Sequence, residues 1–376
     1  DMDDATVKKH LKLFFTNVDR TVLDSFSHAD IGPKATRAGY LILEVQAELE
    51  NAIPNISMKY DPEITDDDFA LACVKCALKT AKPSFANHRM FKNELGENYV
   101  IASCYNGLLL GGGAYTLCRL ILGHIAERSA GIEDFKNNQL PYVMDVMAKY
   151  MDARIAFEVE QSGFFESNFL AKEGLIHRDS FTGMFGLVGL ADAVNVLMTK
   201  EGKDDRFGHS DAATQLGVEI MDIINEFNNN HFNKYCEGTG SHFLLHAQVG
   251  IAEDKGIAPG TRIPIGEEPE ELVDHLNVIS NFHKYFVSGT GDIFPVDLTV
   301  HKNPEYVLDI IKGSWQKDIR YLSFYSSDSD VIRITGYLVK RSEIEKYEQG
   351  NAVLQNTTQL GTGAKKNGRI LERKVR

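Results

Sequence analysis

The spacing of hydrophobic and polar residues predicts that strands and helices alternate near the start of the chain. Residues 55–60 alternate apolar and polar side chains, which is typical of a half-buried strand. The sequence Thr65-Asp-Asp-Asp68 is a capping box that favours a helix through Lys79. Residues 99–104 are predicted to form a second, buried strand. Together these segments predict one βαβ unit, with parallel strands and a right-handed crossover.

The remaining pattern predicts a helical middle third and a return to mixed structure near the end. The sequence Asn303-Pro304-Glu305 has the pattern of a helix cap, a proline at the first helical position and an acidic first turn. Together with a capping box at Ser342-Glu-Ile-Glu345 it predicts two late helices, the second ending near Gly350. In the middle, apolar residues recur at the 3.6-residue helical period, and long helices fit residues 142–160, 188–199 and 211–227. Extended structure is predicted for residues 294–301, 319–325 and 331–339.

The composition narrows the class of protein. With 376 residues, 43% of them hydrophobic, the chain can bury at least one large core, and a single large α/β barrel would be an ordinary outcome. Its 53 acidic and 40 basic residues give a formal net charge of -13, which repels nucleic acid and anionic lipid. We therefore expect a small-molecule substrate, with no nucleic acid and no membrane as partners.

Several features predict a cytoplasmic location. The most apolar stretch, residues 108–126, contains three consecutive glycines together with Arg119 and His124, so it does not predict a membrane span. The first ten residues are acidic and lack an apolar signal core. The five cysteines are an odd number in a long chain, which fits thiols in a reducing compartment better than a disulfide framework.

Two segments could carry chemistry. Cys104 ends a predicted strand just before a glycine-rich loop, where α/β sheets place reactive groups, although a buried cysteine is usually only a small hydrophobe. Gly336 interrupts a run of β-branched and aromatic residues, which ordinarily indicates a bulge or a close backbone approach. Glycine is also the residue whose unhindered Cα can hold an unpaired electron between a donating amide nitrogen and a withdrawing carbonyl.

Taken together, the two segments resemble a known family. Arg333-Ile-Thr-Gly336-Tyr337 is similar to the Arg-Val-Ser-Gly-Tyr signature that carries the radical glycine of pyruvate formate-lyase and its relatives, in the same C-terminal position. Tyr99-Val-Ile-Ala-Ser-Cys104 is similar to the Tyr-Ala-Ile-Ala-Cys-Cys stretch around the active-site cysteines of that enzyme. From these motifs, and from a resemblance over nearly the whole chain, the sequence is identified as a member of the YjjI-type glycyl radical enzymes.

The resemblance implies a fold. It is a pyruvate formate-lyase-like α/β barrel in which opposed cysteine and glycine loops meet in an interior closed to water and oxygen. Residues 1–316 would form the barrel body with the cysteine loop, and residues 317–376 the C-terminal glycine radical region. Members of the group are longer at the amino end, so we expect the barrel to be incomplete at its N-terminus. The oligomeric state is left open, a homodimer included.

The resemblance also implies a mechanism. A separate radical S-adenosylmethionine activase, an iron–sulfur enzyme, removes a hydrogen atom from the glycine Cα, so the cofactor is a protein-derived glycyl radical and no permanently bound cofactor or metal is expected. Gly336 would store the radical, and Cys104 would become the thiyl that abstracts hydrogen from substrate. Arg333 and Tyr337 are expected to hold the glycine loop. Such an enzyme is anaerobic and oxygen-sensitive.

Departures from better-known relatives bear on the reaction. Ser103 stands where pyruvate formate-lyase has a second cysteine, which disfavours acyl transfer, and Asn106 stands where the dehydratase branch has a glutamate base. No cysteine follows Cys236, whereas anaerobic ribonucleotide reductase has a four-cysteine zinc site near its glycine loop. The alternatives are nucleotide reduction of that type and a non-catalytic relative that binds a metabolite. The substrate-binding residues stay unassigned.

A structural role is expected for two other pairs. Cys73 and Cys76 share a face of a predicted helix, but no second Cys-x-x-Cys pair completes a zinc site. His242 and His246 have the spacing of a zinc-protease motif without its glutamate, and a substrate contact is left open for them.

Two further features have structural interpretations. Turns are expected for the Gly-Thr-Gly sequences that begin at Gly238, Gly289 and Gly361. The basic tail, residues 365–376, is expected to be a solvated or locally paired end, with a docking strip for a partner as the alternative.

Overall fold

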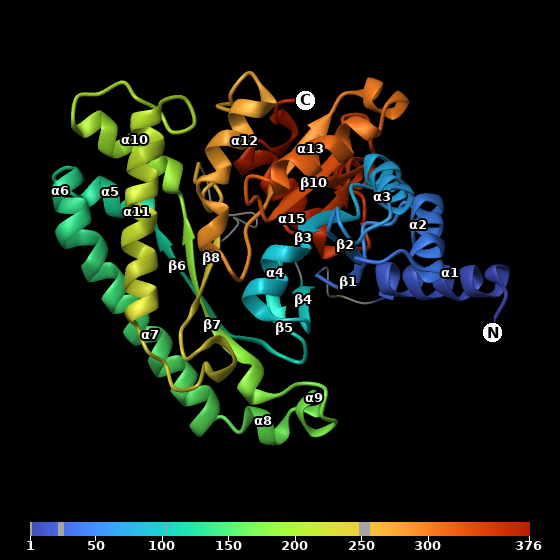
Figure 1. Ribbon diagram of the computed structural model, residues 1–376, viewed down its shortest axis with the longest axis horizontal. Coiled ribbons are helices and arrows are strands. Elements are labelled where there is room, and N and C mark those ends of the chain that lie inside the picture. Colours follow the sequence, from blue (N-terminus) through green and yellow to red (C-terminus); the bar gives the residue numbers. More distant parts are fainter. Residues whose placement is uncertain (1, 22–25, 103, 248–255) are drawn as a thin grey trace.

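The computed structural model describes residues 2–21, 26–102, 104–247 and 256–376. It has two helix-covered sheets that stand apart from each other (Figure 1). Helices from the two ends of the chain cover a five-stranded sheet, and helices from the middle of the chain cover a three-stranded sheet. A short hairpin, β4–β5, lies between them and carries Cys104.

The five-stranded sheet has the order β1-β2-β3-β10-β9. Its first three strands are parallel, β3 runs antiparallel to β10, and β10 runs parallel to β9. The bounds are β1 His28–Ile31, β2 Asn55–Tyr60, β3 Ser84–Asn87, β9 Asp292–Val296 and β10 Tyr321–Ser326.

The other strands form one parallel sheet, in the order β6-β7-β8, and two antiparallel hairpins. Among the described residues the strands thus make separate open sheets. The bounds are β4 Tyr99–Ala102, β5 Asn106–Leu109, β6 Gly113–Ile121, β7 Phe181–Val188, β8 Leu244–Ala247, β11 Val331–Arg333 and β12 Leu338–Lys340.

The α-helices are distributed along the whole chain. Their bounds are α1 Asp4–Thr21, α2 Arg37–Leu49, α3 Asp67–Thr80, α4 His88–Leu95, α5 Leu122–Arg128, α6 Ile132–Asp134, α7 Leu140–Glu160, α8 Phe164–Ser167, α9 Phe169–Lys172, α10 Leu190–Lys200, α11 Asp211–Asn230, α12 Leu272–Ser280, α13 Glu305–Trp315, α14 Arg341–Glu348 and α15 Asn356–Gly368. None of the described helices combines the length and the apolar character that a membrane crossing needs.

The βαβ unit exists, but its second strand differs from the prediction. The parallel partner of β2 beyond α3 is β3, a four-residue strand that directly follows Pro83. The predicted strand over residues 99–104 instead pairs antiparallel with β5 in a separate hairpin, and it is described as far as Ala102 because Ser103 lies outside the described residues. β3 escaped the sequence pattern because four residues are too few to show a period.

The alternation of β2 is real, but the prediction of a half-buried strand is wrong. Ile56, Met58 and Tyr60 pack in the apolar core under α3 and α13, while Asn55 and Ser57 on the opposite face are also buried. Paired residues of neighbouring strands point to the same face, so His28 and Asp30 of β1, which pair with Asn55 and Ser57, lie on that second face too. The sheet therefore turns a polar face toward other parts of the protein rather than toward water.

The long helices are confirmed, with shifted ends. α7 and α11 cover residues 142–160 and 211–227, and α10 starts at Leu190 because Val188 still belongs to β7. β7 was missed because a strand buried on both faces lacks alternation.

The expected caps are mostly displaced. Asp66 rather than Thr65 caps α3, accepting hydrogen bonds from the N–H groups of Asp68 and Phe69. Pro304 is the N-cap of α13 rather than its first residue. Ser342 lies inside the first turn of α14, where its N–H and hydroxyl both bind Asp330.

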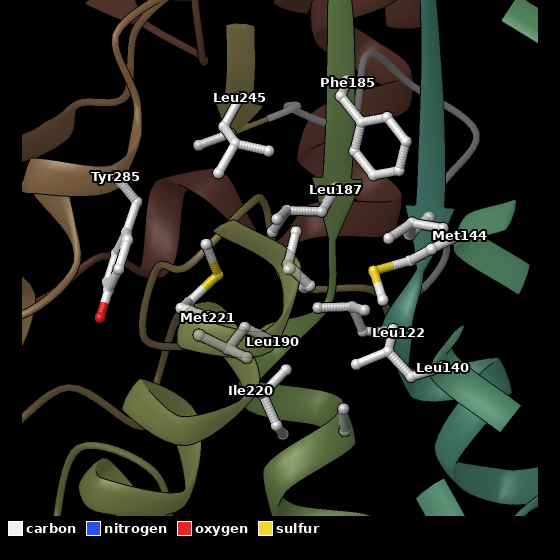
Figure 2. Close-up of a cluster of buried hydrophobic side chains, with 14 of the residues drawn as sticks. Leu122, Leu140, Met144, Phe185, Leu187, Leu190, Ile220, Met221, Leu245 and Tyr285 are labelled. Atoms are coloured by element: carbon white, nitrogen blue, oxygen red, sulfur yellow. The ribbon is translucent and has the colours of Figure 1, made fainter. Parts of the chain in front are cut away.

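Apolar side chains fill the space between the three-stranded sheet and its helices. Figure 2 shows Phe185 and Leu187 of β7, Leu140 of α7, and Ile220 and Met221 of α11 gathered in this core. All five side chains are fully buried. The amphipathic pattern of α7 and α11 thus finds its partner in β7.

Two minor predictions have different outcomes. Cys73 and Cys76 lie in the buried face of α3, where burial raises the pKa of both thiols and the Cys76 thiol contacts the Leu43 carbonyl oxygen at 3.6 Å. Gly361 was expected in a turn, which is wrong, because it lies within α15 and packs against Val339.

The core under the five-stranded sheet gives a stability test. Phe85 of β3 is fully buried between Tyr60 and Phe324, with ring centroids 6.5 Å from each. We expect Phe85→Ala to lower the free energy of unfolding by about 3–5 kcal/mol, measured by urea denaturation. The same change at Phe14, which is 60% exposed, should cost less than about 0.5 kcal/mol. Equal losses from the two variants would contradict this core assignment.

Candidate functional site

Cys104 lies in the turn of the β4–β5 hairpin. At the end of the hairpin, Ala102 is paired with Asn106. Cys104 lies in the turn between them and is buried, with 9% of its surface exposed. The hydroxyl of Tyr321, from β10 of the five-stranded sheet, donates a hydrogen bond to the Cys104 carbonyl oxygen at 3.2 Å. The sheet thereby fixes the position of the cysteine backbone.

Gly336 lies at the tip of a second hairpin, β11–β12. Arg333 pairs with Leu338, and the Ile334 N–H donates to the Tyr337 carbonyl oxygen at 3.0 Å, which leaves Thr335 and Gly336 as the two residues of the turn. The φ angle of Gly336 does not lie in the left-handed region. Backbone conformation therefore does not require glycine at this position.

What requires glycine is the cysteine hairpin. A Cβ atom added to Gly336 would lie 1.8 Å from the Sγ atom of Cys104 and 2.1 Å from its Cβ atom. Because a carbon–carbon single bond is about 1.5 Å long, the sulfur lies within about 3.3 Å of the Gly336 Cα atom itself. The thiol thus faces the Cα hydrogen that occupies the side-chain position of Gly336. This geometry suits exchange of a hydrogen atom between the two groups.

Polar contacts hold the glycine hairpin from two directions. Asn55, the first residue of β2, donates from its side-chain amide to the Gly336 carbonyl oxygen at 3.3 Å and accepts a hydrogen bond of 2.6 Å from the guanidinium of Arg333. From the C-terminal tail, Arg373 donates to the carbonyl oxygens of Arg333, at 2.6 Å, and Ile334. Arg373 is therefore packed on the glycine hairpin rather than solvated, whereas Lys365 and Arg369 pair with Glu348 and Glu372, in line with the expected solvated or locally paired end.

The polar face of the five-stranded sheet supports the cysteine hairpin. The hydroxyl groups of Ser57 and Tyr321 are 2.8 Å apart, and the His28 Nε2 atom is 2.9 Å from the Ser57 hydroxyl. Asp30 of β1 accepts a hydrogen bond of 2.9 Å from the Ile101 N–H in β4. Burial raises the pKa of Asp30 to about 6, with this hydrogen bond and Lys59 opposing the shift. A carboxyl group whose pKa is raised by burial thus lies beside the hairpin.

Aromatic rings enclose the two hairpins. Tyr337 is fully buried and meets the ring of Phe26 edge-on, with centroids 5.8 Å apart, and burial raises the pKa of its phenol. Tyr105, next to Cys104, lies between Tyr321 and His246, and its hydroxyl donates to the Ala247 carbonyl oxygen at 3.2 Å. Tyr105 and Tyr337, the residues that follow Cys104 and Gly336 in the chain, are therefore both buried.

Several other predicted residues border this region. His246 lies in β8 and is stacked beside Tyr105, and burial lowers the pKa of its imidazole to about 4, whereas His242 contacts the His231 carbonyl oxygen at 2.9 Å. Gly289 approaches the cysteine hairpin so closely that a Cβ atom would lie 2.0 Å from the Tyr105 carbonyl oxygen. Gly238 lies in a short 3-10 turn, as expected.

A cavity of about 260 Å³ borders the glycine hairpin. Ile334, Thr335, Arg262, Asp292 and Arg373 are among its lining residues, whereas Cys104 and Gly336 are not. Among the described residues, no group of three or more histidine, cysteine, aspartate or glutamate side chains is arranged to hold a metal ion.

Sequence reasoning missed four residues of this site. Asn55, Asp30, Tyr321 and Arg373 approach the hairpins from segments far away along the chain. The polar positions of β2 were a signal for Asn55, but the sequence alone suggested that they face water. For Arg373 the only signal was the basic composition of the tail.

Comparison with known proteins gives a family match and two curated relatives. The model of the family described as "Glycyl radical enzyme YjjI-like" matches residues 1–376. An uncharacterized protein of Haemophilus influenzae is 46% identical over 369 residues, which cover 97% of this chain and 72% of that protein. The uncharacterized protein YjjI of Escherichia coli is 41% identical over 367 residues, which cover 97% of this chain and 70% of that protein.

Among solved structures, the glycerol-bound B12-independent glycerol dehydratase of Clostridium butyricum superposes with a TM-score of 0.73 at 12% sequence identity. The match covers 100% of this chain and 62% of the dehydratase chain. At this identity the likeness shows a common fold. It confirms the fold class expected from the sequence, that of the barrel-type glycyl radical enzymes.

The Cys104–Gly336 contact can be tested by stability measurements. Gly336→Ala should destabilise the protein by about 1–3 kcal/mol, because the new methyl group overlaps the cysteine side chain. Cys104→Gly removes the two nearest obstacles, so the same alanine should cost at least about 1 kcal/mol less in that background. A double-mutant cycle by urea denaturation checks this coupling. Additive effects would show that the two residues are not in contact.

The raised pKa of Asp30 predicts an unusual pH dependence of stability. Since the folded state binds this proton more tightly than the unfolded state, ionised Asp30 costs stability, and the cost grows as the pH rises from about 4 to about 6. Asp30→Asn should therefore raise the free energy of unfolding by about 2–3 kcal/mol at pH 7 and by much less at pH 4. Asp145→Asn, at an exposed pair on α7, should have little effect at either pH. A gain that is independent of pH would refute this assignment.

Proposed function

The chain belongs to the YjjI-like glycyl radical enzyme family, and from this premise we propose that Gly336 stores an organic radical and Cys104 passes it to a small organic substrate. The observation that carries the proposal is the contact between the Cys104 sulfur and the Gly336 Cα, which leaves no room for a side chain. Backbone conformation does not explain why this residue is glycine, since its φ angle lies outside the left-handed region that favours glycine.

The proposed sequence of steps conserves hydrogen atoms and electrons. An activase removes one hydrogen atom from the Gly336 Cα and leaves a radical there. That radical takes the hydrogen atom of the Cys104 thiol, which re-forms the Cα–H bond and leaves a thiyl. The thiyl takes a hydrogen atom from a carbon of the substrate, and the product radical later recovers it from the thiol. The thiyl then takes a hydrogen atom from Gly336, which restores the stored radical.

The surrounding residues fit this division of roles. Arg333 and Tyr337 are fully buried on the glycine hairpin, where they hold the loop rather than meet a substrate. We assign residues 317–376 as the glycine radical region, noting that β10 of this region is a central strand of the five-stranded sheet. The activating partner would be a radical S-adenosylmethionine enzyme, and the setting an anaerobic cytoplasm.

The residues next to Cys104 narrow the chemistry of the substrate. Ser103 supplies no second thiol for acyl transfer, and Asn106 supplies no carboxylate. Asp30 accepts a hydrogen bond from the cysteine hairpin, and burial raises its pKa to about 6, so it is our candidate for an acid or base at this site. A reaction that needs one proton transfer after hydrogen abstraction fits these groups better than transfer of an acyl group.

The radical assignment has a direct spectroscopic test. Anaerobic incubation with an activase and S-adenosylmethionine should give a doublet in electron paramagnetic resonance, since one hydrogen remains on the Gly336 Cα. Thiol protons exchange with solvent, so in heavy water the reversible transfer with Cys104 should replace that hydrogen by deuterium and collapse the doublet. Exposure to air should then cleave the chain at Gly336.

Matched variants separate the two roles. Gly336→Ala should abolish the doublet and the cleavage. Cys104→Ser should keep the doublet but prevent its collapse in heavy water, whereas Cys118→Ser, at a partly buried cysteine of β6, should behave like the wild type. A non-catalytic, metabolite-binding relative would give no doublet with any variant. A nucleotide reductase would in addition bind nucleotides and zinc.

A further inference from the structure

The carbonyl group of Gly336 has a specific polar partner. Asn55 begins β2, is only 2% exposed, and donates from Nδ2 to the Gly336 carbonyl oxygen at 3.3 Å. The two residues are 281 positions apart in the chain. The carbon of this carbonyl, like the Gly336 amide nitrogen, is bonded directly to the Cα that would hold the unpaired electron.

The amide of Asn55 is polarised from its other side. The Arg333 guanidinium, which is fully buried, donates from Nη2 to the Asn55 Oδ1 atom at 2.6 Å. Its Nε and Nη1 atoms have no hydrogen-bond partner among the described residues. A guanidinium can only donate and a carbonyl can only accept, so these partners fix the orientation of the amide. A positive charge is thus linked through one side chain to the Gly336 carbonyl.

We infer that Arg333 and Asn55 form a polar relay that stabilises the radical stored on Gly336. The inference rests on the proposed function and adds a positioning residue, Asn55, to it. A glycyl radical is stabilised by delocalisation from the amide nitrogen toward the carbonyl. A hydrogen bond to the carbonyl oxygen strengthens its electron withdrawal, and hydrogen bonds in a chain polarise one another.

The relay differs from the contacts that only hold the hairpin. Arg373 already secures the loop through the carbonyl oxygens of Arg333 and Ile334, neither of which is conjugated to the Gly336 Cα. The Asn55 contact is made to the conjugated carbonyl itself. Loss of the Asn55 donor should therefore change the electronic properties of the radical more than the position of the loop.

The substitution Asn55→Asp isolates the donor. Aspartate has the same shape and keeps an oxygen to accept from Arg333, but it places a second oxygen, which cannot donate, against the Gly336 carbonyl. After anaerobic activation we expect a glycine-centred doublet whose splitting differs from that of the wild type, because spin density moves back to the Cα. The doublet should decay about tenfold faster under strict anaerobiosis.

Asn87→Asp is the matched control. Asn87 ends β3 in the same sheet, is 3% exposed, and donates from Nδ2 to the Ile319 carbonyl oxygen at 3.1 Å while its Oδ1 atom accepts from the Met90 N–H. The substitution removes one buried amide-to-carbonyl hydrogen bond of the same kind without touching Gly336. It should leave the splitting and the lifetime of the doublet unchanged.

The outcomes separate the relay from the proposed function. A doublet of wild-type splitting and lifetime in Asn55→Asp would overturn the relay and leave the radical assignment intact. Absence of a doublet in the wild type would overturn both. If circular dichroism shows that Asn55→Asp does not fold, Asn55→Ser, which is smaller and uncharged, takes its place with the same expected shift in splitting and the same control.

Discussion

The close approach of two hairpin turns is the constraint on which this site depends. Cys104 occupies the space that a side chain on residue 336 would need, so the contact exists only while that residue is glycine. Because burial makes every polar group near such a contact costly unless it is hydrogen-bonded, both turns must be satisfied by groups that other segments supply. Strands of the five-stranded sheet and the C-terminal tail supply these hydrogen-bonding groups.

The five-stranded sheet serves as the platform for both turns. Its apolar face packs on helices of the two chain ends, while its polar face holds the cysteine turn through Tyr321 and the glycine turn through Asn55. The C-terminal tail completes the support through Arg373. Two hairpins of low intrinsic stability are thereby fixed by one rigid sheet, which suits the proposed hydrogen-atom transfer, because a small displacement would separate the sulfur from the carbon.

Much of the local structure was predictable because local patterns determine it. The periodicity of α7 and α11 identified both helices, and the alternation of β2 located a strand with its correct ends. The errors share one cause. Whether β3 and β7 form, and whether the polar face of β2 is buried, depends on what is packed against these strands. A strand buried on both faces loses its alternation, and a polar face can be directed toward protein as readily as toward water.

By itself the sequence determined the types of most elements and the two motifs on which the proposed roles of Gly336 and Cys104 rest, since each of these patterns lies in contiguous residues. Only the tertiary structure decided that β2 pairs with β3, that the sulfur lies against the Gly336 Cα, and that Asn55 and Arg373 reach the glycine turn. These contacts join residues up to 281 positions apart. No local pattern encodes such a pairing, because it results from packing whole layers against one another.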